Sequence, residues 1–291
     1  MARFDESFEG RGSGLRLACA DSSFPRLTHA GALAVIRDLG IDAVDVCVFA
    51  GYDHNPPDVV EADPARAAET VGARVSDAGL RISDVFGILG KTFQDRAVNH
   101  PDENVREHSM RFFEALLEFA RRLDAPGVTI LPGATFEGVD EDDSLALAAT
   151  ELERRAAIAG DLGLRFAIEP HFDSVVPTPA RTLDLLDRTE HVGIALDLSH
   201  FVYAGVAPEE AYALIPRTRH VHLRQARPGV IQARAGDGVI DFPQLRDRLL
   251  AAGYEGYLTL EYQWEEGPPH VDFTSVDCIA ETAALRDLML A

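Results

Sequence analysis

Four residues whose side chains bind metal ions well each stand at the end of a short apolar run in the second half of the chain. They are Glu169 in FAIEPH, Asp197 in GIALDLSH, His222 in RHVHLRQ and Glu261 in YLTLEY. The gaps between them are 28, 25 and 39 residues, which suits successive strands separated by helices. A barrel of alternating strands and helices carries its chemistry at the carboxyl ends of the strands. The four side chains are therefore expected to converge on one ion or one substrate.

Three carboxylates and one imidazole make an oxygen-rich set of metal ligands. Such a set suits Mn²⁺, our first choice, as well as Mg²⁺ and Co²⁺, and Zn²⁺ is a less typical alternative. No organic cofactor is expected. For any single one of these residues, the alternative is a strand end that is salt-bridged or faces solvent. Charged residues are rarely buried without a partner, yet four in succession follow apolar runs, which favours one shared site.

Two histidines stand close to these residues in the sequence. His200 comes three residues after Asp197 in DLSH and has three candidate roles: a fifth ligand, a hydrogen-bond donor to a substrate oxygen, or a helix-starting residue without chemistry. We favour the substrate contact, because Asp197 already reaches the ion and the loop after the strand carries His200 toward the pocket. His171, two residues after Glu169, is expected either to contact substrate or to orient Glu169.

Two arginines, Arg224 and Arg227, follow His222 in HLRQARPG. Guanidinium groups beside a carboxylate-rich site are expected to bind hydroxyl, carboxylate or phosphate oxygens of a substrate, although Arg also pairs commonly with structural carboxylates. Asp53 and His54 in AGYDHNPP follow the second strand; one alternative is that they line the same face of the barrel, and the favoured expectation is a solvated loop.

The elements that position these residues are short apolar runs that alternate with longer amphipathic ones. Helical patterns are clearest over residues 105–123, where apolar residues recur at helical spacing, and a last helix is predicted over 272–290. Glycine leads into the second, third, fifth and eighth runs, as is typical where a helix ends in a left-handed residue. The eight runs that read as strands are 15–20, 43–50, 80–86, 127–131, 164–169, 192–197, 220–224 and 257–261. Eight such units without a linker predict an α/β fold, a closed (β/α)8 barrel in a single domain over residues 1–291.

The composition limits the partners of this chain. Its 291 residues carry a formal net charge of −21, which opposes nucleic acid and anionic membranes as partners, because binding to phosphates depends on Lys and Arg. The three cysteines form neither a disulfide framework nor a zinc ribbon, and Cys19 and Cys47 fall inside apolar runs where buried, unreactive thiols are expected. No leader peptide or membrane span is expected, because the segment MARFDESFEGRGSG has no apolar h-region and no run approaches 18 apolar residues. We expect a cytoplasmic enzyme with a small-molecule substrate, and homo-oligomers are compatible with the sequence.

The order of the motifs carries a resemblance. The Glu of IEPH, the D-x-x-H of ALDLSH, the His of HVHLRQ and the segment GDGVIDFPQLRDRLLAAGYEGYLTLEY are similar to the xylose-isomerase-like TIM-barrel superfamily of sugar isomerases and epimerases. The resemblance covers the whole barrel and is specific over residues 164–262. One departure concerns the substrate side: many members carry Lys-Asp after the seventh-strand His, and this chain has Arg224 and Gln225 there.

That resemblance implies roles for individual residues. The family holds one divalent ion at the ends of strands five to eight, which implies the four residues named first as ligands. Its ketose epimerases use the glutamates of strands five and eight as acid and base, which implies Glu169 and Glu261, and its D-x-x-H histidine implies His200 as a substrate contact. Proton transfer next to a carbonyl needs a base, an acid and a group that stabilises the enediolate, and two carboxylates with a divalent ion provide all three. We predict a metal-dependent isomerase or epimerase of a sugar-like polyol carbonyl compound.

Three other functions are alternatives for a barrel of this kind. A lyase or dehydratase acting on a keto-sugar or keto-cyclitol begins with the same proton abstraction and differs in the bond that is then broken. A DNA-repair endonuclease shares the barrel but needs further His and Glu ligands from the earlier strands; the third run ends in VFGILG without one, and the charge opposes DNA. A sugar-binding barrel without catalysis has no need of this ligand set.

Overall fold

Eight strands form the centre of the molecule in a computed structural model that describes residues 16–52, 54–264 and 275–291. Every strand begins and ends within two residues of the run predicted from the sequence. The strands are β1 (Arg16–Ala20), β2 (Ala43–Phe49), β3 (Arg81–Ile88), β4 (Gly127–Ile130), β5 (Arg165–Ile168), β6 (Gly193–Asp197), β7 (Thr218–Leu223) and β8 (Tyr257–Leu260). The short apolar runs were therefore a reliable guide to the strands.

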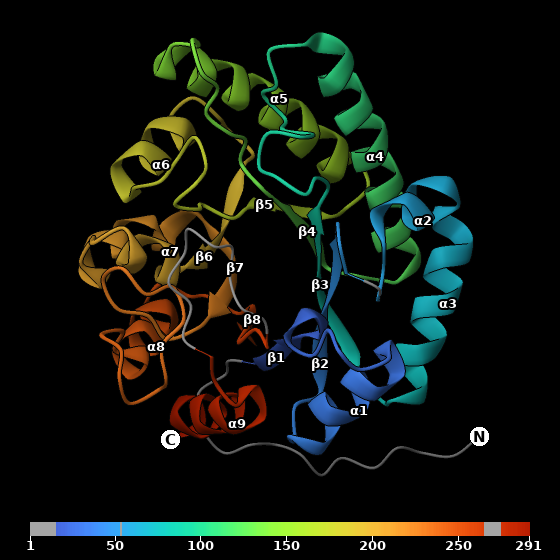
Figure 1. Cartoon of the computed structure of the whole chain (residues 1–291), viewed down its shortest axis with the longest axis vertical. Helices are drawn as coiled ribbons and strands as arrows, with labels where there is room; N and C mark the ends of the chain where they lie inside the picture. Colours follow the sequence, from blue (N-terminus) through green and yellow to red (C-terminus); the bar gives the residue numbers. More distant parts are fainter. Residues whose placement is uncertain (1–15, 53, 265–274) are drawn as a thin grey trace.

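The strands close into a barrel in the order in which they occur along the chain. Each neighbouring pair is parallel, and β1 pairs with β8 to close the barrel, with Arg16 opposite Tyr257 and Cys19 opposite Leu260. Figure 1 shows the strands at the centre and the helices around them. The fold is the predicted (β/α)8 barrel, so all eight strands point their carboxyl ends to the same side.

Helices connect the strands and form the outer layer. They are α1 (His29–Asp38), α2 (Pro57–Ala62), α3 (Pro64–Asp77), α4 (Glu103–Arg122), α5 (Glu141–Asp161), α6 (Pro179–Leu186), α7 (Leu198–Tyr203), α8 (Phe242–Ala251) and α9 (Cys278–Leu290), with 3₁₀ helices η1 (Asp21–Ser23) and η2 (Pro208–Arg217). Within the described ranges, no helix combines the length and the apolar character that crossing a membrane requires.

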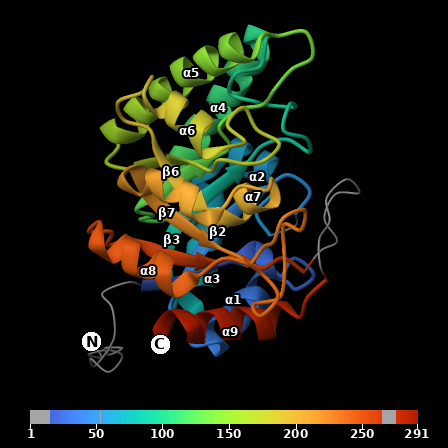
Figure 2. The same cartoon turned by 90° about the vertical axis from the view of Figure 1, so that its left-hand side faces the viewer.

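The last helix closes the outer ring. Figures 1 and 2 both show α9 beside α1, and Arg286 of α9 donates a hydrogen bond to the carbonyl of Leu39, just after α1. The helix was predicted to start near residue 272, and this prediction is wrong for residues 275–277. Residues 272–274 lie outside the described ranges, and 275–277 are not helical. The carboxylate of Asp277 accepts hydrogen bonds from the backbone N–H groups of Ile279 and Ala280, and this N-cap sets the start at Cys278.

Glycines end the helices that precede two of the strands leading to the site, β5 and β8. Gly163 and Gly253 both have a φ of +75°, a left-handed conformation that other residues adopt only with strain. They turn the chain from α5 into β5 and from α8 into β8. The predicted pattern of a helix, a glycine and then a strand is thereby confirmed at the two strands that lead to Glu169 and Glu261.

The apolar core lies between the strands and the helices. In α4 the predicted apolar stripe is buried, including Phe112, Leu116 and Ala120, all at 0% exposure. Cys19 and Cys47 are buried as well, and burial raises the pKa of both thiols, as expected for unreactive cysteines. The inside of the barrel, by contrast, contains charged and polar side chains.

Candidate active site

The four strand-end residues lie together at one end of the barrel. Asp197 is the last residue of β6 and is opposite His222 of β7 in the parallel register. Glu169 and Glu261 come directly after β5 and β8, and their backbone N–H groups extend the ladders to the carbonyls of Ile130 and Leu223. All four side chains are buried, with exposed fractions of 1 to 3%. The parallel register thus gathers residues that are distant in sequence at one buried location.

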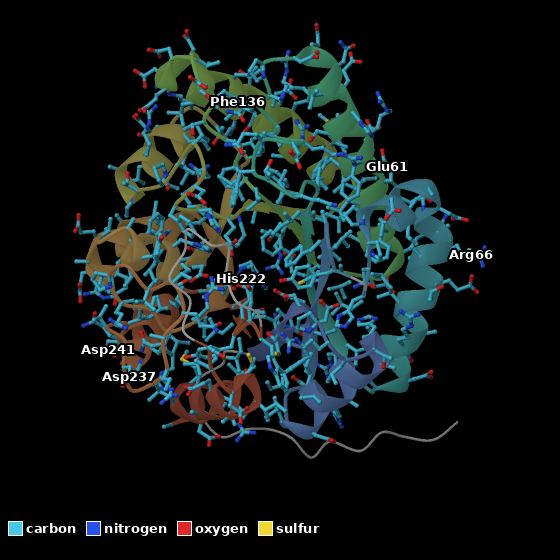
Figure 3. The ribbon with its side chains drawn as sticks, viewed as in Figure 1. Glu61, Arg66, Phe136, His222, Asp237 and Asp241 are labelled. Atoms are coloured by element: carbon cyan, nitrogen blue, oxygen red, sulfur yellow. The ribbon has the colours of Figure 1, made fainter. Side chains whose placement is uncertain are left out.

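Short distances join these side chains. The Nδ1 of His222 lies 2.5 Å from Oε1 of Glu169 and 3.7 Å from Oε2 of Glu261. The Nε2 of His200 lies 3.4 Å from Oδ2 of Asp197 and 3.7 Å from Oε2 of Glu169. Glu169 therefore connects both halves of the group, and Figure 3 shows His222 inside the ring formed by the secondary-structure elements.

The composition and spacing of this group fit a divalent ion. Two overlapping sets, Glu169 with Asp197 and His200, and Glu169 with His222 and Glu261, each place their ligand atoms within 4.8 Å of one another. Carboxylate oxygens joined by imidazole nitrogens are ligands for Mg²⁺, Mn²⁺, Co²⁺ or Zn²⁺. The structure thus brings the four predicted ligands together and adds His200 to their immediate surroundings.

Asp197 is held from two sides. Its Oδ1 accepts a hydrogen bond from the backbone N–H of Ser199 over 2.8 Å, so the carboxylate also caps α7. Its Oδ2 lies 3.1 Å from Nη2 of Arg224, which also donates to the hydroxyl of Ser199 over 3.2 Å. Arg224 is buried, and its Nε has no hydrogen-bond partner among the described residues. The predicted substrate-binding arginine thus lies in the site with one N–H free.

Burial and neighbouring charges shift the pKa values of this group. Burial alone would raise the pKa of Glu169, but the imidazoles of His222 and His200 outweigh it and lower that pKa well below its usual range. Burial would lower the pKa of His222, but Glu261 and Glu169 raise it well above its usual value. Burial raises the pKa of Glu261 to about 7, although His222 opposes this. Before an ion binds, Glu169 and His222 therefore form an ion pair, and Glu261 is partly protonated near neutral pH.

Aromatic rings lie against the two predicted substrate histidines. The ring of His171 is 3.9 Å from that of His200, 4.2 Å from that of Phe172 and 4.5 Å from that of Phe93, measured between centroids. Burial, followed by the electrostatic influence of the neighbouring His200 ring, lowers the pKa of His171 well below its usual value. His171 is therefore a neutral ring between His200 and the loop that carries Phe93.

Predictions were also made for Arg227, expected to bind substrate oxygens, and for His54 and Asp53, expected in a solvated loop. Arg227 is exposed, and within the described ranges no hydrogen bond or ion pair joins its side chain to the buried group. The expected solvated loop is wrong for His54, which is only 8% exposed and whose Nε2 lies 2.9 Å from the carbonyl oxygen of Leu27. Asp53 lies outside the described residues.

The structure adds two residues that strand ends could not reveal. Asp45 lies in the middle of β2, and its Oδ2 is 2.7 Å from Nε2 of His220 and 3.2 Å from Nε2 of His222. Both are buried. A signal was present in each case: Asp45 interrupts the apolar run AVDVCVF, and His220 precedes His222 by two residues, which places both on the same face of a strand.

A closed (β/α)8 barrel with buried carboxylates and imidazoles at the carboxyl ends of its strands has the architecture of a barrel enzyme. The xylose isomerase-like TIM barrel family matches residues 33–283, and the chain belongs to that family.

Relatives within the family have enzyme names. The chain is 28% identical over 252 residues to a Streptomyces coelicolor protein with the provisional name hydroxypyruvate isomerase, covering 79% of this chain and 84% of that one. It is 29% identical over 136 residues to an inosose dehydratase of Clostridium botulinum, covering 40% and 46% of the two chains. The relatives thus include both an isomerase name and a dehydratase name.

Solved structures share the fold over nearly the whole chain. D-Psicose 3-epimerase with D-tagatose from Clostridium cellulolyticum H10 has a TM-score of 0.73 and 15% identity, covering 94% of this chain and 98% of that one. A xylose isomerase-like TIM barrel protein from Mycobacterium smegmatis in complex with magnesium has a TM-score of 0.72 and 18% identity, covering 96% and 97%. At these identities the likeness shows a common fold.

Proposed function

We propose that this chain is a divalent-metal-dependent isomerase or epimerase of a sugar or sugar-like polyol carbonyl compound. The observation that carries the proposal is the pair Glu169 and Glu261, which both face Nδ1 of His222 and whose environments move their pKa values in opposite directions. Two carboxyl groups with separated pKa values are the arrangement expected of a base and an acid that work together.

The proposed ion is held by Glu169, Asp197, His222 and Glu261. Mn²⁺ is our first choice, with Mg²⁺, Co²⁺ and Zn²⁺ as alternatives, and no organic cofactor is proposed. When bound, the ion supplies positive charge that stabilises negative charge developing on the substrate oxygens. The assignment is supported by two three-residue groups that share Glu169, one with Asp197 and His200 and one with His222 and Glu261, each with its ligand atoms within 4.8 Å of one another.

Proton transfer is assigned to the two glutamates. Glu169 is ionised at neutral pH and is the proposed base that removes the proton from the carbon beside the carbonyl. Glu261, with a pKa of about 7, is the proposed acid that returns a proton to the carbon skeleton. A bound cation lowers the pKa of both carboxyl groups, so the order of the two values, and not their absolute size, assigns the roles.

Substrate contacts are assigned to groups beside the glutamates. His200 has an Nδ1 atom without a partner among the described residues, and Arg224 has a free Nε–H, so each can hydrogen bond to a substrate oxygen. His171 packs against His200 and is the proposed third contact. Because the chain has a net charge of −21, we propose a small-molecule substrate and neither nucleic acid nor a membrane as partner.

The test is incubation with Mn²⁺ in heavy water of a ketohexose, hydroxypyruvate and a keto-inositol. We expect an isomeric product that carries deuterium next to the carbonyl, and we expect that no product forms when a chelator is added. Glu169→Gln and Glu261→Gln should each lower kcat by about 10²- to 10⁴-fold, because each removes a proton-handling group. Glu69→Gln, at an exposed position on α3, is the matched control and should keep full activity. Activity that survives both site substitutions would exclude this mechanism.

The second candidate is a lyase of the dehydratase type. It is favoured by the likeness to an inosose dehydratase, although that match covers 40% of this chain. In such an enzyme Glu169 removes the same proton, and the β-hydroxyl group of the substrate then leaves as water, so that a carbon–carbon double bond forms. A product lighter by one water in the same incubation would assign the chain to this class.

A further inference from the structure

A buried polar cluster lies inside the barrel next to His222, and the proposed reaction does not use it. Its members are Asp45 of β2, Ser83 of β3, His220 of β7 and Thr259 of β8, with exposed fractions of 0 to 3%. A carboxylate at such a depth destabilises the fold unless it is paired and hydrogen-bonded. The burial of Asp45 must therefore be compensated by hydrogen bonds or ion pairs with neighbouring side chains.

Every oxygen of Asp45 is engaged. Its Oδ2 lies 2.7 Å from Nε2 of His220 and 3.2 Å from Nε2 of His222. Its Oδ1 accepts a hydrogen bond from the hydroxyl of Ser83, and the hydroxyl of Thr259 lies 3.1 Å from Nε2 of His220. These contacts come from three other strands and fix the carboxylate in the interior of the barrel.

His222 thus lies between two carboxylates through its two ring nitrogens. Nδ1 faces Glu169 over 2.5 Å at the carboxyl end of the barrel, and Nε2 faces Asp45 in the interior. An imidazole that binds a metal through one nitrogen carries its proton on the other, and a carboxylate that accepts this proton fixes the tautomer and the orientation of the ring.

We propose that Asp45 is the positioning residue for His222: by accepting the proton of Nε2, it leaves Nδ1 as the nitrogen that binds the ion beside Glu169 and Glu261. This inference rests on the metal site of the proposed function. It extends that site to a residue of β2, which supplies none of the proposed ligands.

A different role for the same residues is a second metal site. Asp45, His220 and His222 place ligand atoms within 4.8 Å of one another. His222 belongs to this group and to the group of Glu169 and Glu261, so it would have to lose the protons of both ring nitrogens in order to serve two ions. The Oδ1 of Asp45 is already bonded to the hydroxyl of Ser83. The geometry therefore favours one ion for each chain.

Calorimetric titration of the metal-free full-length chain with Mn²⁺ tests the proposal. We expect one ion per chain for the wild type, and one ion bound about 10- to 100-fold more weakly by Asp45→Asn. Asp84→Asn is the matched control: it removes a buried negative charge opposite Asp45 on β3, but this carboxylate is hydrogen-bonded to Thr129, over 2.6 Å, so the variant should weaken Mn²⁺ binding less than Asp45→Asn does.

The outcomes separate the two levels of inference. Unchanged affinity in Asp45→Asn, with a wild type that binds one ion, would overturn the positioning role and leave the proposed function intact. Two ions in the wild type and one in Asp45→Asn would establish the second metal site instead. A wild type that binds no ion would overturn the proposed metal site, and this inference with it.

A second variant and a spectroscopic measurement guard against loss of folding in Asp45→Asn. Ser83→Ala removes one hydrogen bond to Asp45 and leaves the charge of Asp45 in place. It should weaken Mn²⁺ binding, as Asp45→Asn does, but by a smaller factor. In Zn²⁺-loaded protein with ¹⁵N-labelled histidine, the ring proton of His222 should reside on Nε2 and exchange slowly with water. A His222 proton on Nδ1 would contradict the proposal directly.

Discussion

The Nη2 of Arg224 lies 3.1 Å from the Oδ2 of Asp197, and both side chains are buried, at 3% and 1% exposure. This pair places a permanent positive charge among the carboxylates of Asp197, Glu169 and Glu261. Burying three carboxylates together is unfavourable without compensating cations, and Arg224 supplies one that does not depend on pH.

The first prediction concerns Arg224. In Arg224→Gln, Asp197 keeps its hydrogen bond from Ser199 N–H and therefore its orientation, and a positive charge that repels the ion is removed, so Mn²⁺ affinity should not decrease. KM should rise about tenfold or more, because the free Nε–H that is proposed to hold the substrate is lost. Titration calorimetry and steady-state kinetics measure the two effects. Arg227→Gln, at an exposed position, should change neither, and a large loss of metal in Arg224→Gln would show that Arg224 supports the ion instead.

The second prediction concerns the pH dependence of metal binding. Glu261 has a pKa raised to about 7, and His222 has a pKa raised well above its usual value, so both hold protons that must leave when an ion binds. Affinity for Mn²⁺ should therefore increase as the pH rises from 6 to 8 and decrease in the acidic direction. Calorimetry in two buffers of different ionisation enthalpy counts the protons released. An affinity that does not change with pH over this range would contradict the protonated state of Glu261.

The third prediction concerns stability and Asp84. Burial raises the pKa of Asp84 to about 6, His220 opposes this, and the carboxylate of Asp45 adds to it. The native state therefore holds a proton that the unfolded state has lost, so this group favours folding below pH 4 and its contribution is lost as the pH rises to 6. The loss amounts to about 3 kcal/mol at most, because one pKa unit corresponds to roughly 1.4 kcal/mol.

Urea unfolding of Asp84→Asn and the wild type at pH 4, 5, 6 and 8 checks this dependence. The stability of the variant relative to the wild type should increase between pH 4 and pH 6 and then level off. Asp77→Asn, exposed at the end of α3, should show no such increase. A constant difference between Asp84→Asn and the wild type would mean that Asp84 is ionised throughout.

The fourth prediction concerns the contact of β3 with α4. A Cβ atom added at Gly87 would lie 2.6 Å from Cδ2 of Leu116, a side chain at 0% exposure. Gly87→Ala should cost about 1–3 kcal/mol through overpacking. Leu116→Ala should cost about 2–5 kcal/mol through the cavity that it leaves. In the double variant the new methyl group enters that cavity, so the total cost in urea unfolding should be smaller than the sum; strict additivity would show that the two sites do not touch.

Much of the fold follows from local patterns in the sequence. A buried strand of a parallel sheet is a short apolar run, and it ends where a polar residue or a turn begins, so all eight strands are predicted to within two residues. The same rule finds Glu169, Asp197, His222 and Glu261. Once the barrel closes, strand ends lie at one side by necessity, and their meeting needs no knowledge of side-chain contacts. The sequence therefore determined the barrel and the place of the strand-end residues.

Contacts across the barrel were decided only by the tertiary structure. Asp45 and His222 are 177 residues apart, and their contact depends on the closure of the barrel between β1 and β8 and on the side to which each strand turns its residues. Whether Arg224 or Arg227 enters the site depends on the path of the loop after β7, which buries one and exposes the other. A local pattern records which residues are apolar, but it does not record which strands face each other. The partner of each buried charge is consequently fixed by closure and packing.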